Sequence, residues 1–227
     1  MRTPFHDLSR FERMLWAISS FVVIASFVLS GGGDWLSMIA SLVGVTALIF
    51  LAKGYVFGQV LVVIFAALYG VISYLCAYYG EMLTYLCMTA PIAVAAILSW
   101  LRHPYKGTKE VEIRDLKVRH VAALLVLTIL ITFGFYWILK YLGTANLVVS
   151  TLSVATSFFA AGLTVLRSPY YALAYGGNDL VLIVLWVLAS VKDVSYLPMV
   201  FCFVMFLVND LYGFYNWRRM GRRQRGE

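Results

Sequence analysis

The sequence predicts an all-α integral membrane protein with eight transmembrane helices. Its composition is 62% hydrophobic and only 13% charged, whereas soluble domains carry about 25% charged residues. Apolar runs of roughly 18 to 25 residues recur along the chain, and this is the length that a helix needs to cross a bilayer core. Finally, the Lys and Arg residues are confined to the gaps between these runs.

The eight apolar runs cover residues 14–31, 35–52, 55–75, 82–101, 120–141, 147–166, 170–190 and 196–217. Basic residues precede the first run, as they do in a signal peptide. However, no small-residue cleavage site follows, and Gly31-Gly32-Gly33 leads directly into the second run. We therefore interpret the first run as a retained helix. In the fourth run, Pro91 is expected to kink the helix.

The distribution of Lys and Arg predicts the orientation of the chain. With the N-terminus placed in the cytoplasm, sixteen of the eighteen basic residues fall on the cytoplasmic side, and only Lys140 and Lys192 fall outside. This asymmetry favours a multi-pass protein with eight spans and both termini in the cytoplasm. The net charge of +7 is explained by the membrane topology, so we expect no nucleic-acid partner.

A charged segment from Arg102 to His120 divides the chain into halves with matching features. Lys53 follows one apolar run and Trp100 ends another, and Arg167 and Trp217 recur in the second half. This pattern predicts two parallel three-helix repeats, residues 35–101 and 147–217. Residues 1–34 form an N-terminal segment with an extra helix, residues 102–146 a linker with a connecting helix, and residues 218–227 a basic cytoplasmic tail. The alternative is that the similarity of the two halves is coincidental, because any chain with eight spans can be divided in a similar way.

Polar side chains within the seventh run are the strongest candidates for a functional site. Tyr171, Tyr175, Asn178 and Trp186 share one helical stripe, and Asp179 lies on its edge. Polar groups at bilayer depth are costly and normally face a cavity or the bundle interior. Aromatic planes beside an amide and a carboxylate would suit a flat polar ring that carries a sugar.

Two polar residues in other runs extend this candidate site. Gln59 lies in the third run and Asn209 in the eighth, each on a face of small or polar residues. The alternative reading of these faces is helix packing, in which interhelical hydrogen bonds hold a non-transporting sensor or assembly subunit together.

Enzyme chemistry has little support in the sequence. His6, His103 and His120 all lie in predicted cytoplasmic segments, and no HExxH, GxSxG or P-loop motif is present. The three cysteines are interpreted as small hydrophobic residues rather than as a disulfide or a metal site. We therefore expect a non-enzymatic protein with no cofactor and no bound metal. Ion coupling through Asp179 or Asp210 stays open at this point.

Three stretches resemble the nicotinamide riboside transporter family (PnuC). They are LAKGYVFGQVLVVIFAALYGVISYLCAYYGEMLTYL, KEVEIRDL and FLVNDLYGFYNWRR, and the resemblance extends from about residue 35 to residue 219. It implies a SWEET-like 3+1+3 helical core with one additional N-terminal helix. It also implies facilitated diffusion of a vitamin precursor, trapped by a cytoplasmic kinase that phosphorylates it. A bacterial inner-membrane location and a homotrimer are further implications.

The chain departs from the family pattern in its seventh run. Family members that carry nicotinamide riboside show a Trp-x-x-Trp pair followed by an Asn. Asn178 matches the Asn, but Tyr171 and Tyr175 stand near the tryptophans with a different spacing. The expected substrate is nicotinamide riboside, bound by Tyr171, Tyr175, Asn178, Asp179, Trp186, Gln59 and Asn209. Thiamine, riboflavin and deoxynucleosides are the alternative substrates.

Overall fold

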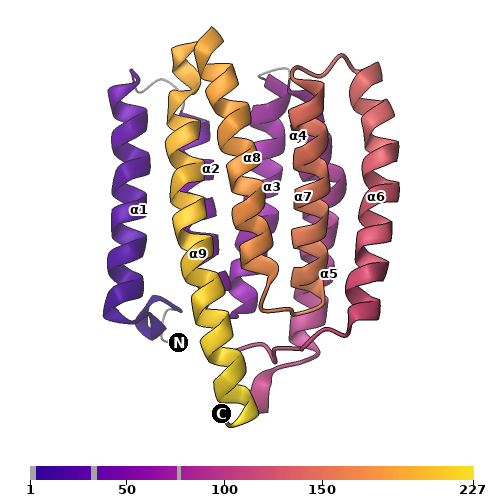
Figure 1. The fold of residues 1–227 in the computed structure, drawn as a ribbon. Coiled ribbons are helices and arrows are strands. Elements are labelled where there is room, and N and C mark those ends of the chain that lie inside the picture. Colours follow the sequence, from indigo (N-terminus) through magenta and orange to yellow (C-terminus); the bar gives the residue numbers. More distant parts are fainter. Residues whose placement is uncertain (1–3, 32–34, 76–77) are drawn as a thin grey trace.

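A computed structural model of the chain describes residues 4–31, 35–75 and 78–227. These residues include eight helical segments long and apolar enough to cross a membrane, which confirms the eight predicted spans. The helices lie side by side in one bundle, and both termini lie at the same end of it (Figure 1). We call this the terminal end of the bundle and the other the distal end.

The helices are α1 (Arg10–Leu29), α2 (Trp35–Ala52), α3 (Val56–Leu75), α4 (Tyr79–Leu83), α5 (Ala90–Leu101), α6 (Val118–Tyr141), α7 (Leu147–Val165), α8 (Tyr171–Lys192) and α9 (Leu197–Arg225). Helix α2 packs on α3 and α9, and α8 packs on α7 and α9. Helix α1 packs on α2 and α9, and α6 packs on α7. Figure 1 accordingly shows α1 and α6 at opposite edges of the bundle.

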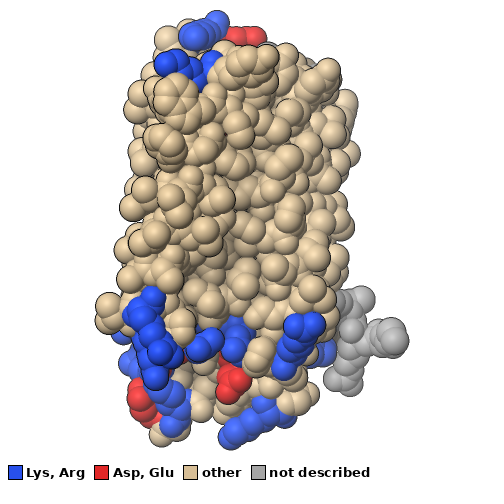
Figure 2. All heavy atoms as spheres, turned by 90° about the vertical axis from the view of Figure 1, so that its right-hand side faces the viewer, with Lys and Arg blue, Asp and Glu red and all other residues tan. Residues whose placement is uncertain are grey.

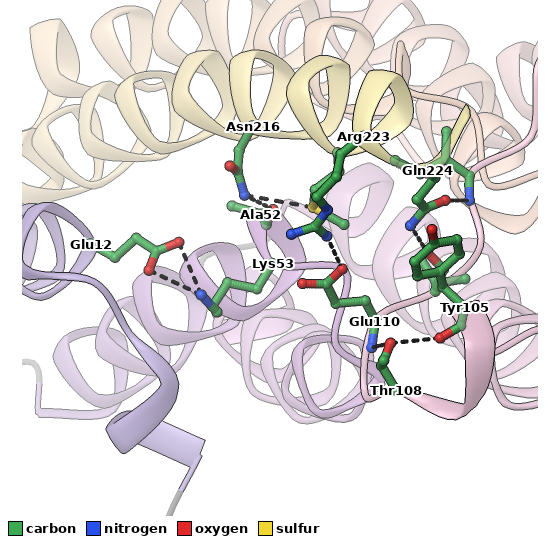
Figure 3. Close-up of polar contacts among 12 residues, drawn as sticks. Glu12, Ala52, Lys53, Tyr105, Thr108, Glu110, Asn216, Arg223 and Gln224 are labelled. Atoms are coloured by element: carbon green, nitrogen blue, oxygen red, sulfur yellow. Dashed lines mark hydrogen bonds and ion pairs between the residues drawn. The ribbon is translucent and has the colours of Figure 1, made fainter. Parts of the chain in front are cut away.

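Two helix boundaries differ from the sequence expectation for local physical reasons. The first helix begins at Arg10, because Ser9 and Glu12 form a reciprocal capping box that satisfies backbone N–H groups at the helix start. The last helix continues through the basic segment 218–225. Arg223 forms an ion pair with Glu110, and the side-chain amide of Gln224 bonds to the linker backbone (Figure 3).

The fourth span is not a uniform α-helix. Helix α4 passes into a π-helical turn, η2 (Thr84–Thr89), and then into α5. Pro91 lies just after the π-helical turn, and proline cannot donate the backbone hydrogen bond that a regular helix requires. Such π-helical turns often occur at functional sites, and this one faces the centre of the bundle.

Helix α9 holds the terminal end of α2 through side-chain hydrogen bonds. The indole Nε1 of Trp217 donates to the carbonyl of Leu51 at 2.8 Å, and the amide Nδ2 of Asn216 donates to the carbonyl of Ala52 at 2.8 Å. These carbonyls belong to the last turn of α2, where the helix itself supplies no partners.

Helix α5 does the same to α7. Trp100 Nε1 donates to the carbonyl of Thr164 at 3.0 Å, and Ser99 Oγ donates to the carbonyl of Val165 at 2.8 Å. The Trp100 and Trp217 rings meet with centroids 5.4 Å apart. The first half of the chain therefore caps a helix of the second half, and the second half caps a helix of the first.

The turns that follow these capped helices also match. Gly54 and Arg167 both have positive φ, 69° and 60°, and their amides bond back into the preceding helices. The linker joins the two turns, because Val111 N donates to Gly54 O at 2.9 Å and Arg114 N donates to Arg167 O at 3.0 Å. The terminal end of the bundle is thus tied together across both halves.

The surface has the charge pattern of a membrane protein. Figure 2 shows Lys and Arg gathered at the terminal end, a broad uncharged belt above them, and a small charged group at the distal end. Large hydrophobic side chains are exposed along α6, among them Ile129 and Phe133. The chain is therefore a multi-pass membrane protein.

Candidate functional site

A small cavity lies inside the bundle, where α2, α3, η2, α7, α8 and α9 meet. Its volume is about 60 Å³, which is enough for a few water molecules. Its lining residues are Gly44, Ala47, Leu48, Leu51, Gln59, Val62, Phe65, Tyr85, Thr89, Ser157, Tyr175, Asn178, Asp179, Phe203, Phe206 and Asp210. The polar segment of the seventh span therefore faces a cavity. Helix α8 continues through this segment without a break.

The Asn178 side chain is held in a fixed orientation at the cavity wall. Its Oδ1 accepts hydrogen bonds from Thr156 Oγ1 at 2.8 Å and from Ser157 Oγ at 2.9 Å, both on α7. With the carbonyl side of the amide engaged, the NH₂ group is the part of Asn178 left to meet a ligand. The amide can thus recognise a hydrogen-bond acceptor.

Two carboxyl groups and a second amide share the same cavity. Asp179 on α8 and Asp210 on α9 both belong to its lining. Gln59 on α3 is buried, and its Nε2 donor has no partner among the described residues. Asp179 Oδ2 likewise has no partner there. Buried polar atoms are nearly always paired in proteins, so these two atoms on the cavity wall are candidates to contact a ligand.

Aromatic residues close the cavity toward the distal end. Phe65, Tyr85, Phe203 and Phe206 line it, and each packs against at least one other ring of this group. Tyr85 comes from the π-helical turn η2, which brings its ring to the cavity wall. Gly44 permits the close approach of Phe206, because a Cβ at Gly44 would lie 2.3 Å from Phe206 Cζ.

Four of the seven predicted site residues line the cavity. They are Gln59, Tyr175, Asn178 and Asp179. These four come from two helices on different sides of the cavity, α3 and α8.

Tyr171, Trp186 and Asn209 lie outside the cavity lining. Tyr171 packs on Trp217 toward the terminal end, with ring centroids 4.5 Å apart. Trp186 lies behind the distal aromatic wall, where its Nε1 donates to the hydroxyl of Tyr69 at 2.8 Å. A helical stripe fixes the direction of these side chains but not their depth, so the stripe extends past the cavity at both ends.

Asn209 faces the added helix α1 instead of the cavity. Its Nδ2 donates to Ser19 Oγ at 2.9 Å. The next residue, Asp210, is turned by about 100° around the helix and faces the cavity. Among the lining residues that the predicted set omitted, Asp210 had a clear sequence signal, since a carboxyl group within an apolar span is costly. Tyr85 and Ser157 had none.

Comparisons with known proteins agree with this architecture. Residues 34–219 match the model of a family described as nicotinamide mononucleotide transporter. A nicotinamide riboside transporter PnuC from Neisseria mucosa is 26% identical over all of this chain and 88% of the relative. A protein of the same name from Haemophilus influenzae is 26% identical over 84% of this chain and 82% of its own length.

A solved structure gives the same result for the fold. The crystal structure of the vitamin B3 transporter PnuC superimposes with a TM-score of 0.84 at 26% identity, covering 96% of this chain and 94% of the other. The family match covers most of the sequence, and the fold match extends to nearly every helix. The chain is therefore a membrane transporter, not an enzyme, and it belongs to the nicotinamide mononucleotide transporter family.

Proposed function

We propose that this transporter carries nicotinamide riboside by facilitated diffusion, with the substrate bound in the central cavity. The observation that carries the proposal is the set of polar groups on the cavity wall. They are the oriented amide of Asn178, the Nε2 group of Gln59, which has no partner among the described residues, and the carboxyl groups of Asp179 and Asp210. The carboxamide and ribose of nicotinamide riboside offer both donors and acceptors to such groups. The relatives named above carry the same substrate name.

Within this proposal the predicted residues take two roles. Gln59, Tyr175, Asn178 and Asp179 contact the substrate. Tyr171, Trp186 and Asn209 position the helices around it, because each packs or bonds to a neighbouring element outside the cavity. The aromatic contacts to the ring then come from Tyr175, Tyr85 and the phenylalanines of the distal wall.

The cavity must widen for transport to occur. Sites for drug-sized ligands typically measure about 300–1,000 Å³, far more than the 60 Å³ found here. The proposed motion is rocking of one three-helix repeat, residues 35–101, against the other, residues 147–217. The reciprocal tryptophan caps at the terminal end join the two repeats, so opening toward that end requires the caps to separate.

The cellular setting is part of the same proposal. The basic terminal end faces the cytoplasm of a bacterial inner membrane, and this orientation is supported by the positive-inside rule, because Lys and Arg gather at that end (Figure 2). A cytoplasmic kinase would trap the substrate by phosphorylating it, since facilitated diffusion alone cannot concentrate a solute. A homotrimer, which the family resemblance implies, stays a prediction.

Substrate binding to purified variants tests the site. Asn178→Leu removes the amide that faces the cavity and is expected to abolish nicotinamide riboside binding while the folded protein persists. Asn209→Leu is the matched control, because that amide is equally buried but bonds to Ser19 on α1. It should lower thermal stability and leave the affinity of the folded fraction unchanged. Equal loss of affinity in both variants would contradict the proposed site.

Thiamine, riboflavin and deoxynucleosides remain the alternative substrates, and a thermal-shift panel separates them. A ligand that binds the folded state raises the melting temperature in proportion to the logarithm of its concentration over Kd. Stabilisation by nicotinamide riboside is the expected result. If only one of the other compounds raises the melting temperature, that compound is the substrate instead of nicotinamide riboside.

A further inference from the structure

The two carboxyl groups of the cavity have no positively charged partner among the described residues. Asp179 and Asp210 are both buried, with 3% and 4% of their surface exposed. Among the described residues that line the cavity there is no Lys, Arg or His. The ion pairs found in the described part of the chain involve neither carboxyl group.

Burial without a partner charge is energetically unfavourable for such groups. A carboxylate that leaves water loses its hydration, and two adjacent carboxylates also repel each other. A bound cation supplies the partner charge that such a carboxyl group lacks, so it favours the ionised form. A ligand with one positive charge would therefore be stabilised beside the pair more than a neutral ligand.

A second, independent observation points to a ligand in the same place. The Nε2 donor of Gln59 is buried and lines this cavity, and it has no hydrogen-bond partner among the described residues. The aromatic rings of Tyr85, Phe65 and Phe206 form the adjoining wall. Aromatic faces attract cations, so the wall and the carboxyl groups favour the same kind of ligand.

We propose that Asp179 and Asp210 select the substrate by its charge, so that a cationic aromatic ring is favoured over a neutral ring of the same shape. The inference rests on the proposed function, because it concerns the same cavity. It adds Asp210 to the substrate-contacting residues and assigns the selectivity to the pair.

Glu81 provides a matched control within the chain. It is a third buried carboxyl group, located on α4, and its Oε1 accepts a hydrogen bond from Ser153 Oγ at 2.8 Å. Glu81 does not line the cavity. Its replacement by Gln therefore removes a buried carboxyl group at a comparable cost without changing the charge at the cavity wall.

The test compares nicotinamide riboside, whose ring is cationic, with its dihydro form, whose ring is neutral. Dissociation constants are measured for the purified full-length protein by calorimetry. The wild type and Glu81→Gln are expected to bind the cation at least about tenfold more tightly, given the strength of charge interactions away from water. Asp179→Asn and Asp210→Asn should reduce this ratio to about threefold or less. Melting curves without ligand confirm that each variant is folded.

Two results would overturn the inference. One is a ratio near one between the wild-type dissociation constants for the neutral and the cationic compound. This measurement needs no variant, so it remains decisive even if an Asn variant fails to fold. The other is an unchanged ratio in both folded Asn variants. A panel with thiamine, riboflavin and deoxyuridine separates this failure from failure of the proposed function. If only the cationic compound thiamine binds, the proposed substrate is wrong and the proposed selection by charge stands. If only the neutral compounds bind, the proposed selection by charge is refuted.

Discussion

Replacement of Trp217 by Phe tests the interpretation that the tryptophan caps hold the two halves of the bundle together. Trp217 is fully buried, and its indole Nε1 donates to Leu51 O at 2.8 Å. Phe keeps an aromatic ring at this position but has no N–H donor. The change therefore removes the hydrogen bond and part of the packed ring, and it leaves the rest of α9 intact.

The expected destabilisation follows from these two losses. Leu51 O also accepts the amide of Gly54 at 2.8 Å, so the carbonyl keeps one partner, and the lost hydrogen bond costs about 0.5–1.5 kcal/mol. The smaller ring leaves a void worth about 1–2 kcal/mol. Together they lower the free energy of unfolding by about 1.5–3.5 kcal/mol, which corresponds to a decrease of about 3–14 °C in the melting temperature.

The measurement is thermal unfolding of the purified protein in one detergent at one scan rate. Trp35→Phe is the control, since the Trp35 side chain is 65% exposed and its truncation should cost less than about 0.5 kcal/mol. The Trp100→Phe change should resemble Trp217→Phe. Because the two rings touch, the double variant should deviate from additivity by about 0.5–1.5 kcal/mol. A Trp217→Phe shift no larger than that of Trp35→Phe would refute the reasoning.

Two further predictions concern the cavity wall and the terminal end. Gly44→Val should destabilise the fold by about 1–3 kcal/mol and weaken ligand binding, because the new side chain would displace Phe206 into the cavity. The control is Gly177→Ala, which should change neither property because an added Cβ there meets no atom within 4 Å. Melting curves measure the stability of both variants, and ligand titrations measure their binding. At the surface, the hydrogen bond from Lys109 lowers the pKa of Asp7 below its usual 3.8. The stabilisation from this pair is complete above pH 3.8 and is lost as the pH falls through the lowered pKa. An NMR titration of the Asp7 carboxyl group should show a midpoint below 3.8. The Lys109→Met variant should raise that midpoint toward 3.8.

The fold could be predicted because membrane spans depend on length and hydrophobicity, and both are local properties of the sequence. Each expected run overlaps a helix of the structure. The helix starts were less predictable where a cap decided them. The Ser9 and Glu12 capping box, for example, extends the first helix to Arg10, ahead of the point where the apolar run begins.

The site could be predicted only in part, because helical periodicity gives the direction of a side chain and not its surroundings. Asn178 and Asp179 reach the cavity as expected, whereas Trp186 ends in an aromatic cluster two turns away along the same stripe. Asn209 and Asp210 are neighbours in sequence, and only the position of α1 decides which of them faces inward. The pairing of Trp100 with Trp217 likewise depends on tertiary structure.

Transport itself is the central claim, and liposomes test it most directly. Purified protein reconstituted into liposomes should equilibrate labelled nicotinamide riboside across the membrane without an ion gradient or ATP. Asn178→Leu should reduce this exchange to the level of empty liposomes. Asn209→Leu should preserve it when liposomes with equal amounts of folded protein are compared. Uptake that requires a gradient or ATP, or an absence of uptake by the folded wild type, would contradict the account.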